Sequence, residues 1–191
     1  MRHVVALLAF VHFAAFGASE TPQAAAEAFY RWVLAYRGGG LPSPEQRKQL
    51  TRLVTPELIR LLAAASATEI RCTAELPPYM KGPVWEGNPF VSVYEGATEA
   101  WYGASRTEGR QVVVEVHLLG VDDKRPKGNR YRTYIWQDRV TLQKQKSGWL
   151  VADVHRGESL AGMLREYVDT ACDRPSAQGD AATTRGVHTT D

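Results

Sequence analysis

The sequence predicts an α+β domain, in which helices pack on one face of a curved four-stranded antiparallel sheet and a last helix closes the fold. Three observations support this prediction. Apolar residues recur at helical spacing over 22–65, they alternate with polar residues over 97–155, and helical spacing returns over 157–171. Helices and strands that follow one another in blocks indicate separate helical and sheet layers rather than alternating β and α units.

The first helix is predicted over Pro22–Arg37. Thr21 is a suitable N-cap, and Pro22 takes the first helical position, where its missing N–H has no intrahelical partner to lose. Six apolar side chains form one stripe, which predicts burial against the sheet. Its aromatic members belong either to the core or to the edge of a pocket. The stripe consists of Ala25, Ala28, Phe29, Trp32, Val33 and Tyr36.

Two further helices are predicted before the sheet. Ser43-Pro44-Glu45-Gln46 has the pattern of a capping box, and Thr55-Pro56-Glu57 begins a second helix directly afterwards. The segment 73–96 then changes in character, because it is rich in proline and glycine and also in aromatic residues. A loop of this length in a compact domain is often functional, and its aromatic side chains indicate that it folds over an apolar surface.

Four strands are predicted over residues 97–105, 111–119, 130–144 and 149–155, joined in series as antiparallel neighbours. The hairpin tip at 120–129 is long and charged. Together with Arg130 and Arg132 it carries five cations within nine residues, which indicates either a solvated loop or a site that docks an acidic partner or an acidic surface.

The two ends of the chain differ from the domain between them. Residues 1–19 resemble a secretory signal, with Arg2 before an apolar run and small residues near Ala18 and Ser19 as a cleavage site. The apolar run is shorter than the about 20 residues that a membrane-spanning helix needs, so we expect no stable membrane insertion. Residues 20–172 form the predicted domain, and 173–191 a disordered tail. The expected location is periplasmic or secreted.

Charge and cysteine content exclude some classes of partner. The net charge of +2 gives no field suited to nucleic acid. Cys72 and Cys172 are the two cysteines, and both fall in the exported part of the chain, where disulfides persist. We therefore expect them to form a bridge. No histidines stand at the spacing of a metal site, and we expect neither a metal nor a cofactor.

Three segments resemble the DUF3828 family of exported bacterial proteins, within the NTF2-like, cystatin-like superfamily. They are Phe29-Tyr30-Arg31-Trp32, Asn88-Pro89-Phe90 and Trp149-Leu150-Val151-Ala152-Asp153-Val154. The resemblance covers residues 24–171. It implies a bent sheet wrapped around a helix to form a cone with a pocket at one end. It also allows a homodimer, because such sheets often pair through their faces, and it implies no particular activity.

Asp153 and His155 are the candidates for catalysis. Strict alternation places them on one face of the last strand with Trp149 and Val151. If that face lines the cone, the carboxylate could orient the imidazole as an acid/base pair. The other interpretation is structural, with Asp153 hydrogen-bonded to backbone or to Arg139 at a corner of the fold.

A second face brings together Tyr134, Trp136 and Asp138, as a ligand wall with one acceptor or as ordinary cross-strand packing. The full set of ligand-binding candidates is aromatic apart from Asp138. It comprises Trp32, Tyr36, Trp101, Tyr134, Trp136, Asp138 and Trp149.

The pattern as a whole favours an exported, non-enzymatic binding protein. The chain lacks a P-loop, a GxGxxG fingerprint and a GxSxG elbow. Its ligand would be a small apolar molecule or a peptide, or it would cap a protein partner such as a secreted toxin, as an immunity protein does. The alternative is an NTF2-like pocket enzyme that uses Asp153 and His155.

Overall fold

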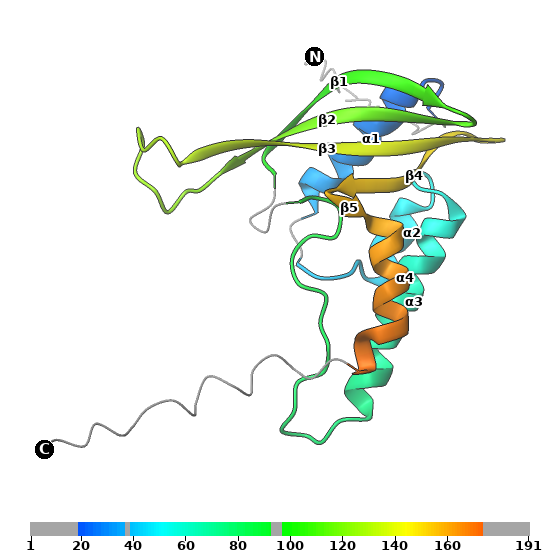
Figure 1. The fold of residues 1–191 in the computed structure, drawn as a ribbon, viewed down its shortest axis with the longest axis vertical. Helices are drawn as coiled ribbons and strands as arrows, with labels where there is room; N and C mark the ends of the chain where they lie inside the picture. The colour runs from blue at the N-terminus through cyan, green and yellow to red at the C-terminus, as the bar shows by residue number, and fades with distance from the viewer. Residues whose placement is uncertain (1–18, 37–38, 93–96, 174–191) are drawn as a thin grey trace, which may run out of the picture.

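The computed structural model describes residues 19–36, 39–92 and 97–173. The predicted signal at 1–18 and the predicted tail from 174 onward lie outside these residues. The described part is an α+β arrangement, as predicted, with helices in two places around one open antiparallel sheet (Figure 1).

Three helices precede the sheet, and each begins at a proline that follows a capping Thr or Ser. They are α1 (Pro22–Ala35), α2 (Pro44–Leu50) and α3 (Pro56–Ala74). The Thr21 hydroxyl accepts from the N–H of Ala24, and Ser43 and Gln46 form the complete predicted capping box. These caps satisfy N–H groups that have no intrahelical partner, which explains why short helices begin where they do.

The sheet consists of four long strands and one short one, in the order β1-β2-β3-β4-β5. The long strands are β1 (Glu99–Glu108), β2 (Gln111–Val121), β3 (Thr133–Gln145) and β4 (Gly148–Arg156). The two-residue strand β5 (Glu158–Ser159) was not predicted. It turns the chain directly into α4 (Leu160–Thr170), which ends in the short 3₁₀ helix η1 (Ala171–Asp173).

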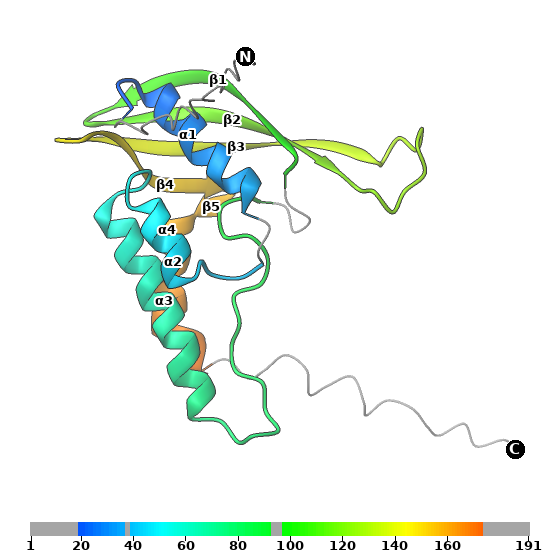
Figure 2. The same cartoon turned by 180° about the vertical axis from the view of Figure 1, so that it is seen from behind.

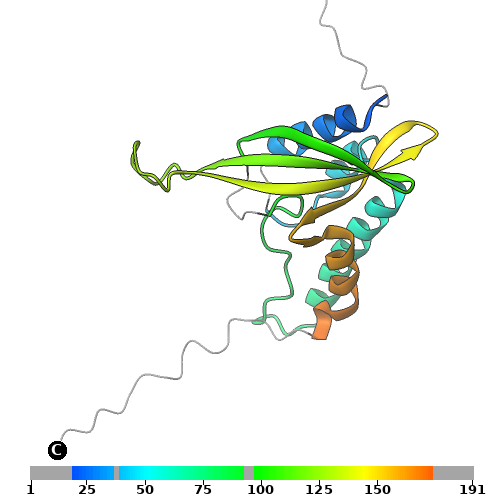
Figure 3. The ribbon, with the colours of Figure 1, turned by 45° about the horizontal axis from the view of Figure 1, so that its top comes forward.

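The sequence predicts that the helices pack on one face of the sheet, and the structure shows this arrangement only in part. Among the described helices, only α1 crosses one face, where it contacts all four long strands (Figure 2). The helices α3 and α4 lie side by side and run away from the β4 edge (Figure 3). That edge is covered at Val151, whose N–H donates to Leu53 O at 2.9 Å and whose C=O accepts from Thr55 at 2.8 Å. These two hydrogen bonds fix the connection between α2 and α3 at the β4 edge, so α3 begins there rather than on the face of the sheet.

The main core lies between α1 and the sheet. From α1 it takes Phe29, Tyr30 and Val33, all nearly inaccessible to solvent. The facing residues of β2 and β3 are paired across the strands and alternate regularly: Val112 with Leu142, Val114 with Val140, Val116 with Asp138, and Leu118 with Trp136. The long loop before β1 adds Trp85, Phe90 and Val91 to the core, which confirms that it folds over an apolar surface.

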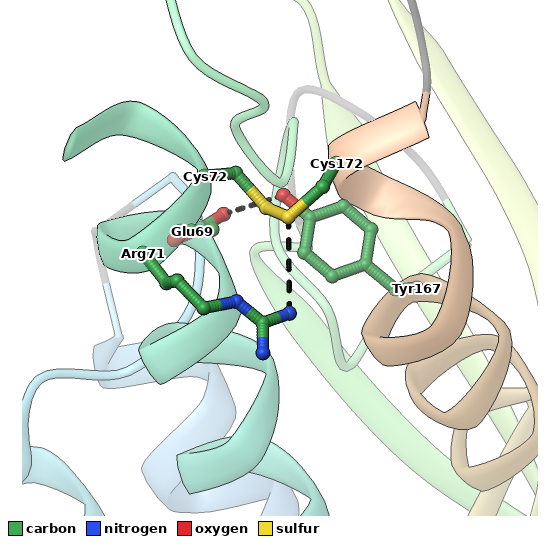
Figure 4. The surroundings of a disulfide bond; sticks show 5 residues. All are labelled: Glu69, Arg71, Cys72, Tyr167 and Cys172. Carbon is green, nitrogen blue, oxygen red and sulfur yellow. Dashed lines mark hydrogen bonds between the residues drawn. A yellow bond between two sulfur atoms is a disulfide. The ribbon is translucent and has the colours of Figure 1, made fainter. Parts of the chain in front are cut away.

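A disulfide joins Cys72 of α3 to Cys172 of η1, with Cα atoms 5.1 Å apart (Figure 4). The predicted bridge is therefore confirmed. Beside it, Tyr167 donates a hydrogen bond to Glu69 at 3.1 Å, and Arg71 contacts the Cys172 sulfur at 3.7 Å. The bond fastens the far ends of the two helices that leave the sheet edge.

Candidate functional site

A carboxyl group is buried in the core between α1 and the sheet. Asp138 lies on the core face of β3, opposite Val116, and is 1% exposed. Its Oδ1 accepts from the Ser92 hydroxyl at 2.7 Å, whereas Oδ2 has no hydrogen-bond partner among the described residues. Burial raises the pKa of Asp138, and Ser92, Arg156 and Trp136 oppose this shift only in part. The ionised form of Asp138 therefore has too few hydrogen-bond donors around it to offset its burial.

Aromatic groups surround this carboxyl on the same face. Trp136 precedes it by two residues and stacks on Tyr134, with ring centroids 5.5 Å apart. Tyr134 in turn lies over Gly120, where an added Cβ would come within 2.3 Å of the ring. Tyr30 reaches in from α1, and burial together with Asp138 raises the pKa of its hydroxyl. The predicted shared face of Tyr134, Trp136 and Asp138 is confirmed.

Arg156, at the end of β4, is a second charged group that is partly enclosed. Its guanidinium donates to the carbonyls of Val91 at 2.7 Å and Asn88 at 3.3 Å. Burial lowers the pKa of Arg156, and Asp138 opposes that shift. Arg156 also lines a cavity of about 450 Å³ beside Trp85 and Tyr167. Together with the Ser92 hydroxyl, these contacts hold the loop 88–92 against the sheet.

The buried carboxyl should make stability depend on pH. Because its pKa is raised in the folded protein, the folded state binds more protons than the unfolded state between the ordinary value of 3.8 and the raised value. Wild-type stability therefore falls as pH rises through that interval. Asp138→Asn should remove this pH-dependent loss of stability. At a pH above the interval, the variant should be more stable than wild type by about 1 kcal/mol, in the range for replacing a buried polar group that lacks hydrogen-bond partners.

Urea unfolding of both proteins across an acid-to-neutral pH series would measure this difference. Asp122→Asn is the control, because that carboxylate pairs with Arg125 at the surface and has a lowered pKa, so any pH dependence that its replacement removes has the opposite sign. A stability difference between wild type and Asp138→Asn that is independent of pH would contradict the assignment.

The larger space for a ligand lies on the other side of α1, between this helix and α2. It is a groove of about 680 Å³. Ala28, Trp32 and Leu53 provide its apolar surface. Trp32 is held in place on two sides: its Nε1 donates to Gln49 Oε1 at 2.9 Å, and its ring stacks on Tyr36 at 5.1 Å. The Tyr36 hydroxyl donates to Gly40 O at 2.9 Å, so this pair of rings is fixed.

The charges around the groove are mainly positive. Arg31, Lys48 and Arg52 line it, against one carboxylate among the described lining residues, that of Glu45. That carboxylate accepts from the Ser43 hydroxyl at 2.9 Å, and hydrogen bonds at the start of α2 lower its pKa. Glu45 is therefore engaged locally. The groove presents an apolar aromatic wall beside three cations, which suits a ligand with an apolar body and an anionic group.

Asp153 and His155 lie on the opposite face of the sheet from Asp138. Their partners on β3 are Thr141 and Arg139, and a bulge at Ala152 interrupts the alternation, so that Val151 pairs with Leu142. The prediction that Trp149 and Val151 share a face with Asp153 and His155 is therefore wrong. A bulge adds one residue to a strand and reverses the facing of every residue beyond it, which alternation alone does not reveal.

The contacts of Asp153 are those of a structural corner. Its Oδ1 accepts from the backbone N–H groups of Ala161 and Val154, each at 2.9 Å, and its Oδ2 from the Ser159 hydroxyl at 2.5 Å. His155 Nε2 lies 3.4 Å from Oδ2. The two side chains do meet, but the carboxylate is already engaged in fixing the start of α4.

The two remaining aromatic candidates lie apart from both sites. Trp101 is 41% exposed and stacks on His117, on the face of the sheet away from α1. Trp149 lies near the β3–β4 turn, with Lys144 Nζ 5.3 Å from its ring. The predicted candidates thus divide among the buried cluster, the groove and two separate surfaces.

Several residues of these sites were not among the predicted ones. Ser92 contacts Asp138 from the long loop, whereas Tyr30 of α1 and Arg156 of β4 interact with it electrostatically, so no local pattern connects the three. Lys48 and Arg52 follow one another at a spacing of four, and Arg31 adjoins Trp32. The spacing of the two cations was a usable signal for a basic helix face.

Comparisons with known proteins give no family for this chain: a scan against family models, a search of curated proteins and a search of solved structures each returned no match. Within the described ranges, no three His, Cys, Asp or Glu side chains are grouped so that they could hold a metal ion. Across those same ranges, every helix is too short or too polar to span a bilayer.

Proposed function

We propose that the protein is an exported, non-enzymatic binding protein of the NTF2-like, DUF3828 type, whose groove between α1 and α2 holds an amphipathic anion. The observation that carries this proposal is the groove itself, in which Trp32 and Leu53 lie beside Arg31, Lys48 and Arg52. Its volume lies within the range of about 300–1,000 Å³ that is typical of small-molecule sites.

Export and the fold type are supported separately. The Cys72–Cys172 bridge suits an oxidising compartment such as the periplasm. The helix α1 crossing an antiparallel sheet is compatible with a cone. The alternative of an enzyme that uses Asp153 and His155 has less support, because neighbouring donors already engage both oxygens of Asp153.

The positively charged side chains that line the groove indicate the charge of its ligand. A carboxylate at the mouth of the groove would meet Lys48 and Arg52 from α2 and its C-terminal turn, while an alkyl chain covers the indole of Trp32. A charge-assisted hydrogen bond contributes about 1.5–3 kcal/mol, so each cation is expected to contribute roughly tenfold or more to affinity.

Dodecanoate is a suitable probe, and calorimetric titration measures its binding. Lys48→Glu with Arg52→Glu should weaken binding by about 100-fold, because two attractive contacts become repulsive. The matched control is Arg110→Glu with Lys146→Glu, which makes the same change of charge at exposed turns. It should leave the affinity within about twofold of wild type.

Two results would overturn the groove assignment. One is equal loss of affinity in the groove variant and the control, which would indicate only a net-charge effect. The other is equal affinity for dodecanoate and its neutral amide. If dodecanoate does not bind and a protein co-purifies in a manner that depends on Lys48 and Arg52, the occupant is a protein partner, such as a toxin, and the small-ligand proposal fails.

A further inference from the structure

The hairpin between β2 and β3 extends beyond the rest of the sheet. The pairing of β1 with β2 begins at Glu99 and Leu119, whereas β2 and β3 stay paired as far as Val121 and Thr133. The tip, residues 122–132, projects away from the helices in two views of the fold (Figures 1 and 3). We call residues 122–132 the arm tip. Because the arm tip projects, it can contact a broad surface that the rest of the domain does not reach.

The arm tip is held in a defined shape by its own contacts. The Asp122 N–H donates to Arg132 O at 2.8 Å. Two ion pairs, Arg125 with Asp122 and Arg132 with Asp123, are each 2.8 Å long. Arg132 also donates to Arg125 O at 2.6 Å. Both carboxylates of the tip are thus engaged by two of its five cations.

Three of the five cations of the arm tip have no carboxylate partner among the described residues. Among the described residues, no carboxylate lies within ion-pair distance of Lys124, Lys127 or Arg130. With five cations and two carboxylates, the tip has a net charge of +3, larger than the +2 of the whole chain. The positive charge of the protein is therefore concentrated at the point that reaches furthest from the fold.

An aromatic ring accompanies this charge. Tyr131 is 57% exposed, and the guanidinium of Arg130 lies over its ring, 4.4 Å from the centroid. Ile135, four residues further on in β3, is 61% exposed. Tyrosine beside arginine and lysine is the combination found at the interface between lipid and water, where the ring enters the headgroup layer and the cations meet lipid phosphates.

We propose that the arm tip docks the protein on an anionic phospholipid surface. These three cations have no carboxylate partner in the described part of the chain and lie within seven residues of the projecting turn, with Arg130 held by the ring and hydroxyl of Tyr131. A flat, laterally mobile layer of anionic headgroups can meet all of them at once. An acidic protein would need carboxylates in a fixed complementary arrangement. Each cation near such a surface adds about 1 kcal/mol, so the three together should strengthen partitioning by about 100-fold. This inference does not depend on the groove.

Vesicle co-sedimentation of the full chain tests the proposal, with phosphatidylcholine vesicles that contain or lack phosphatidylglycerol. The variant Lys124→Gln, Lys127→Gln, Arg130→Gln should bind the anionic vesicles about 100-fold more weakly than wild type. Its matched control is Lys81→Gln, Arg110→Gln, Lys146→Gln, which removes the same charge from exposed positions elsewhere. The apolar segment at 4–16 is the same in every sample, so a difference between the variants cannot come from it.

The control variant should bind like wild type, and added salt should weaken both. Equal loss in the two variants would overturn the proposal, because net charge alone would then explain binding. Equal binding of wild type to neutral and anionic vesicles would also overturn it. So would binding of soluble polyglutamate through the arm tip without any binding to vesicles, which would indicate an acidic protein partner instead. Unchanged thermal unfolding of both variants verifies that each is folded.

Discussion

Replacing Cys72 and Cys172 together by alanine is expected to lower the free energy of unfolding by about 4–5 kcal/mol. The two residues are 100 positions apart, so the bridge closes a loop that contains the entire sheet. In the chain-entropy model, a cross-link over so long a loop removes many conformations from the unfolded chain. Since domains are stable by only about 5–15 kcal/mol, this loss would be a large part of the total.

Denaturant unfolding of the oxidised wild type, the reduced wild type and the double variant measures the effect. Reduction breaks the bond while it keeps both side chains, so it separates the cross-link from the packing of Cys72, which is 3% exposed. The reduced wild type should be about as stable as the double variant, and reductant should not change the variant. A loss below about 1 kcal/mol on reduction would contradict the loop argument.

Phe90→Ala is expected to cost about 3–5 kcal/mol, the range for removing a large buried aromatic side chain. Phe90 is fully buried and makes edge-on contacts with Phe29 and Trp32, each with ring centroids 5.6 Å apart. Its N–H donates to Asn88 Oδ1 at 2.9 Å, which fixes the turn that delivers the ring. The ring therefore anchors the long loop to α1, and its loss would leave a cavity beneath Trp32.

Tyr79→Ala is the matched control, because Tyr79 is an aromatic residue of the same loop but is 86% exposed. Its replacement should change stability by less than about 0.5 kcal/mol. Phe90→Leu should cost less than Phe90→Ala, since most of the volume is kept. Equal effects of Phe90→Ala and Tyr79→Ala in denaturant unfolding would mean that the loop does not depend on this anchor.

The elements that the sequence predicted correctly are those that depend on near neighbours. The caps at Thr21, Ser43 and Thr55 each accept a hydrogen bond from an N–H three residues later. The alternation along β2 and β3 is regular, so the shared face of Tyr134, Trp136 and Asp138 could be predicted. Such patterns arise within about four residues, and a single sequence displays them directly.

The elements that only the tertiary structure decided depend on distant partners. The bulge at Ala152 moves Asp153 to the face opposite Val151, where it meets the start of α4. The buried position of Asp138 depends on Ser92, 46 residues away in the sequence.

In the same way, the groove forms because α2 packs beside Trp32. In the arm tip, both carboxylates pair with Arg125 and Arg132, so Lys124, Lys127 and Arg130 have no carboxylate partner within the described ranges. By itself, the sequence determined the four helices and the four long strands, and it contained the two cysteines that form the disulfide. Which side chains are buried, paired or left facing outward was decided by packing, because burial and register are set by contacts between segments far apart in the chain.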